Sequence, residues 1–66
     1  MADDEKILAI MRATGPVLPV DIAKGLKTNI LLASAYLSEL VARKKIKITK
    51  VKIGGSPLYY MSGQEA

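Results

Sequence analysis

The chain has 66 residues, half of them apolar, and no cysteine or histidine, so we expect one small domain without disulfides, cysteine or histidine zinc ligands, or a histidine general base. No apolar run approaches the roughly 18 residues of a membrane span, and the acidic start is unlike a signal peptide, so a cytoplasmic protein with no membrane partner is expected. The net charge of +4 divides unevenly, because residues 1–26 contain three basic and four acidic residues (−1), whereas residues 27–66 contain seven basic and two acidic residues (+5).

A first helix is predicted from Asp3 or Asp4, either of which can cap it, to about Ala13, where a Thr-Gly-Pro sequence follows. Its apolar face would consist of Ile7, Ile10 and Met11, with Leu8 on the flank. The pair Val17-Leu18 lies between two prolines and is predicted to be a very short strand that adds one or two pairings to the edge of a small sheet.

A second helix is predicted to begin at Pro19 or Val20, because proline is tolerated in a first helical turn, and to include Leu26. Glycine weakens a helix by roughly 1 kcal/mol relative to alanine. Gly25 therefore indicates either close packing against a neighbour or an early end of the helix.

A long third helix is predicted within residues 28–43, with Thr28 or Asn29 as its N-cap. Two helices joined by a turn of three or four residues form a helix-turn-helix unit. On a helical projection the core-facing positions of the third helix are Ile30, Ala33, Leu37, Leu40 and Val41. Tyr36 lies on the flank of that face and is expected to pack.

A β-hairpin is predicted to follow. Residues 45–48 and 51–53 alternate between polar and apolar, but the apolar parity shifts across Thr49-Lys50, which predicts a bulge or local twist there. The sequence GGSP at 54–57 is a strong turn signal, and residues 58–61 are typical of a short strand. Tyr59 and Tyr60 should point to opposite faces, one toward the core and the other exposed. Residues 62–66 are expected to be a frayed tail or the cut end of a longer protein.

The predicted order of elements, together with the segment ASAYLSELVARKKIKI at 33–48, resembles the winged helix-turn-helix superfamily of DNA-binding domains. The resemblance covers about residues 4–61, and its core positions are matched by Leu37, Leu40, Val41 and Ile46. It implies an α+β fold of three helices with a small antiparallel hairpin as the wing. It also implies one domain over residues 1–66, complete or as the N-terminal module of a longer protein, with a role in transcription regulation or DNA maintenance.

Basic residues are concentrated just after the third helix, where six of the ten residues 43–52 are basic and none is acidic. A polyanion is the natural partner of such a segment. The candidate phosphate contacts are Arg43, Lys44, Lys45, Lys47, Lys50 and Lys52. The alternative is that these lysines form a solvated strand edge that discourages aggregation.

The predicted outward face of the third helix is poor in hydrogen-bond donors, and it contains Leu31, Leu32, Ser34, Ala35, Ser38 and Glu39. Base edges are read by hydrogen bonds, so the candidates for base contact are limited to Asn29, Ser34 and Ser38. Leu31 and Leu32 either are buried against the first helix, a flanking segment or the Val17-Leu18 edge, or form with Ala35 an apolar surface for a protein partner.

The sequence favours a module that binds double-stranded DNA mainly through phosphate contacts of the basic hairpin and the long third helix, with this helix at or in the major groove. The module would act either as a homodimer or attached to a further domain of the same chain. RNA binding through the hairpin and an exposed tyrosine is an alternative, as is protein interaction or dimerisation through the third helix. No enzyme activity, metal or cofactor is expected. The acids Asp3, Asp4 and Glu5 are explained by their place at a helix start, and no nucleophile has a base partner.

Overall fold

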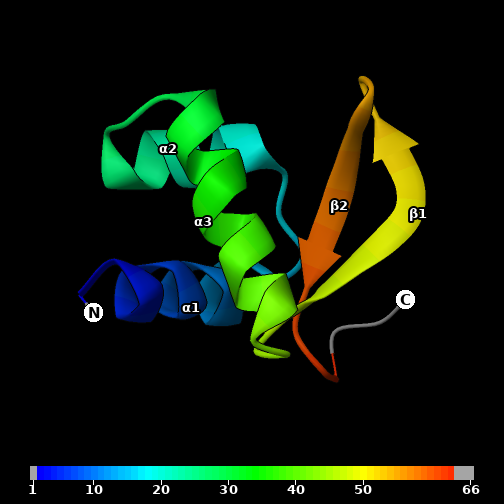
Figure 1. The fold of residues 1–66 in the computed structure, drawn as a ribbon, viewed down its shortest axis with the longest axis horizontal. Coiled ribbons are helices and arrows are strands. Elements are labelled where there is room, and N and C mark those ends of the chain that lie inside the picture. Colours follow the sequence, from blue (N-terminus) through cyan, green and yellow to red (C-terminus); the bar gives the residue numbers. More distant parts are fainter. Residues whose placement is uncertain (1, 64–66) are drawn as a thin grey trace.

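The computed structural model describes residues 2–63 and contains three helices followed by an antiparallel hairpin (Figure 1). The elements are α1 Ala2–Thr14, α2 Pro19–Leu26, α3 Ile30–Ala42, β1 Lys47–Ile53 and β2 Ser56–Tyr60. The predicted α+β fold with a small hairpin after the helices is therefore confirmed. In Figure 1 the hairpin projects beside the helices, and its turn lies at the end away from the C-terminus of α3. We call residues 47–60 the wing.

The start of α1 differs slightly from the prediction, whereas α2 and α3 begin as predicted. Because α1 begins at Ala2, Asp3 and Asp4 lie within its first turn and do not cap it, although their charge still complements the positive end of the helix. The helix α2 begins at Pro19, and the Asp21 carboxylate accepts a hydrogen bond of 2.8 Å from the Leu18 N–H. The cap of α3 is Asn29, whose Oδ1 accepts a hydrogen bond of 2.8 Å from the Leu32 N–H.

A lysine in the left-handed conformation follows the end of both α2 and α3. Lys27 has φ 56° and Lys44 has φ 63°. Beyond each lysine the next N–H donates back to the last turn of the helix, from Thr28 to Ala23 O at 2.9 Å and from Lys45 to Leu40 O at 2.9 Å. This is the Schellman arrangement, which usually has glycine at the left-handed position. The lysines therefore hold the turns at a conformational cost that glycine would avoid.

Gly25 marks the close approach of α1 and α2. A Cβ atom at this position would lie 2.7 Å from Cδ1 of Ile10. The helix also ends one residue later, at Leu26. Both explanations that the sequence suggested for this glycine, close packing and an early helix end, are thus correct.

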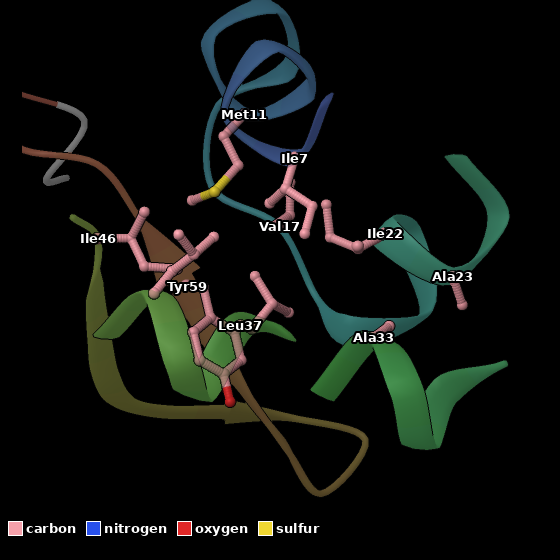
Figure 2. Packing of buried hydrophobic residues seen from close by; sticks show 10 residues of the cluster. Ile7, Met11, Val17, Ile22, Ala23, Ala33, Leu37, Ile46 and Tyr59 are labelled. Atoms are coloured by element: carbon pink, nitrogen blue, oxygen red, sulfur yellow. The ribbon is translucent and has the colours of Figure 1, made fainter. Parts of the chain in front are cut away.

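The core combines side chains from all three helices and the wing (Figure 2). Its buried members are Ile7, Met11, Val17, Ile22, Ala23, Ala33, Leu37, Leu40, Ile46 and Tyr59. Leu8 and Tyr36, which were predicted to flank the core, pack against it and are partly buried. Ile10 and Val41, which were predicted to face the core, are also only partly buried. The prediction was wrong for Ile30, which is 53% exposed. Ile30 is the first residue of α3, so it projects past the surface that α1 and α2 provide.

A single bridge joins the wing to the segment between α1 and α2. Val17 pairs with Tyr59, and the two residues exchange backbone hydrogen bonds of 2.8 and 2.9 Å. This confirms the short pairing expected of Val17. Because β2 pairs with Val17 on one side and β1 on the other, β1 is the outer strand of the sheet.

The register of the hairpin contains the predicted irregularity. Ile48 pairs with Tyr59 and Lys52 with Pro57, so the three residues 49–51 of β1 lie opposite the single residue Leu58. One extra residue would reverse which face of the sheet the following side chains of β1 point to. Two extra residues leave the faces of the following side chains unchanged, so even-numbered and odd-numbered residues of β1 stay on opposite faces. Ile53 therefore does not return to the face of Ile48, and its side chain is 51% exposed.

The ends of β2 also differ from the prediction. The turn consists of Gly54-Gly55, and β2 already begins at Ser56. Tyr59 is 4% exposed and belongs to the core, as expected of one of the two tyrosines. Tyr60, expected to be exposed, is half-buried on the opposite face. Of the expected tail, residues 64–66 lie outside the described residues.

Candidate nucleic-acid interface

The lysines of the wing lie on its outer strand. Lys47, Lys50 and Lys52 all belong to β1, and all three side chains are exposed. A strand advances about 3.3 Å per residue, so the seven residues of β1 extend over about 20 Å. The lysines thus form a strip along the strand, with one end near the helices and the other beside the Gly54-Gly55 turn.

This strip has charges on both faces of the wing. Lys47 pairs with Tyr60, and cross-strand partners share a face. Lys52 pairs with Pro57, which lies two residues from Tyr59 and so shares the face that contributes to the core. Lys47 and Lys52 therefore project from opposite faces of the same outer strand. A polyanion that surrounds this strand can contact lysines on two sides.

Two further lysines lie where α3 passes into the wing. Lys44 and Lys45 are exposed and follow Arg43, the C-cap of α3. The left-handed turn at Lys44 redirects the chain from the helix into β1, with the Lys44 N–H donating to Val41 O at 2.9 Å. Neither lysine has a carboxylate partner within residues 2–63. Both ammonium groups are accordingly available to a ligand.

Arg43 differs from Lys44 and Lys45 because two carboxylates hold its guanidinium group. Its Nε lies 3.0 Å from Oε2 of Glu39, one turn earlier on α3, and its Nη1 lies 3.1 Å from Oδ2 of Asp4 on α1. The contact between Arg43 and Glu39 has the i, i+4 spacing of helical ion pairs, so the sequence contained a signal for it. No sequence pattern indicated Asp4, which is 39 residues away and was interpreted only as a helix-start acid.

The polar candidates on α3 are spread along the helix. Asn29 is exposed at its start, but its Oδ1 is occupied by the cap, so its amide NH₂ is the group left for a ligand. Ser38 is exposed, and Ser34 is half-buried. From Ile30 to Ala42 the only charged residue is Glu39. The helix face can therefore supply few hydrogen bonds and no positive charge.

An apolar surface lies at the N-terminal end of α3. Leu31 is 81% exposed, and Leu32, Ala35 and Ile30 are exposed as well. Burial of Leu31 and Leu32, the first of their two predicted alternatives, is thus wrong. The surface lies at the opposite end of α3 from Lys44 and Lys45, about 20 Å away for a helix of 13 residues.

No helix in residues 2–63 combines the length and apolar character needed to cross a membrane. Within the same residues, no group of three acidic side chains is arranged to hold a metal ion. No family model matches the chain, and neither a curated protein nor a solved structure gives a significant match.

Proposed function

We propose that this protein binds double-stranded DNA, with the wing contacting phosphates on both sides of a groove. The observation that carries the proposal is the pairing of Lys47 with Tyr60 and of Lys52 with Pro57, which puts the two lysines on opposite faces of the outer strand. The two backbones of a duplex flank each groove, so an inserted ribbon meets phosphate on both sides. The major groove is wide enough to admit a two-stranded β-ribbon.

The charge distribution supports the same proposal. The four acidic residues of the first 26 lie on α1 and α2, whereas residues 40–63 contain no acidic residue. Lysines neutralise phosphates and release counterions irrespective of base sequence. We expect the dissociation constant for a random duplex to lie at about 10⁻⁶–10⁻⁴ M at physiological salt, the usual range for non-specific binding.

Low sequence specificity is part of the proposal. Discrimination between bases requires hydrogen bonds or apolar contacts at base edges. On α3 the polar groups available for this are the NH₂ of Asn29 and the hydroxyls of Ser34 and Ser38. A role in transcription regulation or DNA maintenance follows from the resemblance to winged helix-turn-helix domains and is part of the proposal.

The wing lysines provide the test. We expect Lys50→Ala combined with Lys52→Ala to weaken binding to a random-sequence duplex and to reduce the slope of log K against log [salt] by about 1.8, or 0.9 for each lost phosphate contact. Lys6→Ala combined with Lys24→Ala removes the same charge from exposed positions on α1 and α2. Equal effects of the two pairs would contradict a role for the wing.

Other nucleic acids give a second comparison. Insertion into a groove requires two flanking backbones, so a single strand of the same sequence should bind more weakly than the duplex. Duplex RNA has a deep, narrow major groove that side chains do not enter, and it should also bind more weakly. Tighter binding to RNA would favour the alternative in which the wing and Tyr60 contact RNA.

The exposed surface of Ile30, Leu31 and Leu32 supports protein interaction as a second candidate function. Large exposed apolar side chains that lie together tend to mark contact sites. The exposed face of the 13-residue helix α3 is about 20 Å long and 10 Å wide, so its area is smaller than the roughly 800 Å² that each partner buries in a stable interface. A stable complex would therefore need contacts beyond this face. Sedimentation of the wild type beside Leu31→Ser tests self-association, and two monomers of equal size would exclude a homodimer through this face.

A further inference from the structure

The side chain of Arg43 lies between two carboxylates, and these come from different helices. Glu39 contacts Nε at 3.0 Å and Asp4 contacts Nη1 at 3.1 Å, so the two carboxylates engage different donors and can bind at the same time. All three side chains are at least partly exposed to solvent. The contact therefore lies on the surface, next to Lys44.

A guanidinium group binds carboxylates and phosphates through the same N–H donors, and both contacts are charge-assisted. A phosphate that approaches Arg43 must therefore displace a carboxylate or share its donor. Lys44 and Lys45, the adjacent cations, have no such competitor within the described residues. At Arg43, intramolecular competition for the cation is therefore built into the fold.

We propose that Asp4 and Glu39 compete with nucleic-acid phosphate for Arg43 and so lower the affinity of the interface. This inference rests on the proposed function. Asp4 matters most, because it brings a charge from α1 to the point where α3 passes into the wing. Exposed ion pairs are weak, so the competition adjusts the affinity and does not block binding. A change that neutralises Asp4 should release Arg43 for phosphate.

The test compares Asp4→Asn with Asp3→Asn in binding to a random-sequence duplex, measured by fluorescence anisotropy over a series of salt concentrations. Asp3 lies in the same first turn and carries the same charge, but it makes no ion pair with Arg43. The comparison removes the general effects of lost negative charge and of the helix dipole. We expect Asp4→Asn to bind about two- to fivefold more tightly than Asp3→Asn, in keeping with the strength of an exposed ion pair.

The comparison of Asp4→Asn with Asp3→Asn, repeated in an Arg43→Ala background, shows whether the gain in affinity requires Arg43. There Asp4→Asn and Asp3→Asn should bind equally, and a gain that persists without Arg43 would overturn the inference. Glu39→Gln, which leaves α1 unchanged, should likewise give a gain that depends on Arg43. If the wild type binds the duplex but Asp4→Asn and Asp3→Asn bind it equally, this inference is overturned and the proposed function is not. Failure of the wild type to bind duplex at low salt would overturn the proposed function as well.

Discussion

Val17 and Tyr59 exchange two backbone hydrogen bonds, at 2.8 and 2.9 Å, and thereby attach the wing to the segment between α1 and α2. The Tyr59 side chain reinforces this attachment, because its ring is buried with Ile46 and Leu37 in the core (Figure 2). The wing is therefore fixed near its base, while Lys50 and Lys52 lie further along the strand, toward the Gly54-Gly55 turn.

The two adjacent tyrosines should differ sharply in their contribution to stability. Removing a large buried aromatic side chain costs about 3–5 kcal/mol, and a domain of this size is stable by only about 3–10 kcal/mol. Tyr59→Ala is therefore expected to remove a large part of the free energy of unfolding. Tyr60→Ala, on the half-buried opposite face, should cost much less. Urea unfolding followed by far-UV circular dichroism measures both, and equal losses would contradict the assigned faces.

Glycine at position 27 should stabilise the fold. Lys27 has φ 56°, where a side chain destabilises the folded state by about 1–2 kcal/mol. Glycine removes this strain, but its greater entropy in the unfolded chain offsets part of the stabilisation. The net expectation for Lys27→Gly is about 0.5–1 kcal/mol of added stability. Lys24→Gly, inside α2, should instead lose about 1 kcal/mol. Thermal and urea unfolding of the two variants should shift in opposite directions.

Asn29 caps α3 and is also a candidate for contact with a base, and substitutions can separate these two roles. Asn29→Ala removes the acceptor of the Leu32 N–H and should cost about 1 kcal/mol of stability. Asn29→Asp keeps an acceptor at the cap and should remain stable. The aspartate lacks the NH₂ donor and adds negative charge, so it should weaken duplex binding. If Asn29→Asp binds like the wild type, Asn29 does not contact DNA.

Much of the fold could be predicted because local signals agreed with the tertiary structure. The Thr-Gly-Pro sequence ended α1 within one residue of the prediction, and the prolines around Val17-Leu18 indicated a short strand correctly. Ile30 was misjudged for a physical reason. Helical periodicity gives the direction of a side chain around the axis, but not how far along the axis the neighbouring helices extend.

The interface was less predictable, because it depends on pairings between distant residues. The shift of parity at Thr49-Lys50 indicated an irregular strand, but only the pairing with β2 shows that it contains two extra residues and so separates Ile48 from Ile53. The contact of Asp4 with Arg43 joins residues 39 positions apart, and each residue already had a local explanation at a helix end. Exposure of Leu31 depended on which surfaces α1 and α2 left uncovered.

The salt dependence of wild-type binding to a random-sequence duplex tests the central claim most directly. If at least three of the lysines at 44, 45, 47, 50 and 52 contact phosphate, log K should fall against log [salt] with a slope of about −2.7 or steeper. Affinity would then drop about 40-fold or more between 50 and 200 mM salt. No detectable binding at 50 mM salt, or binding that is independent of salt, would contradict the account.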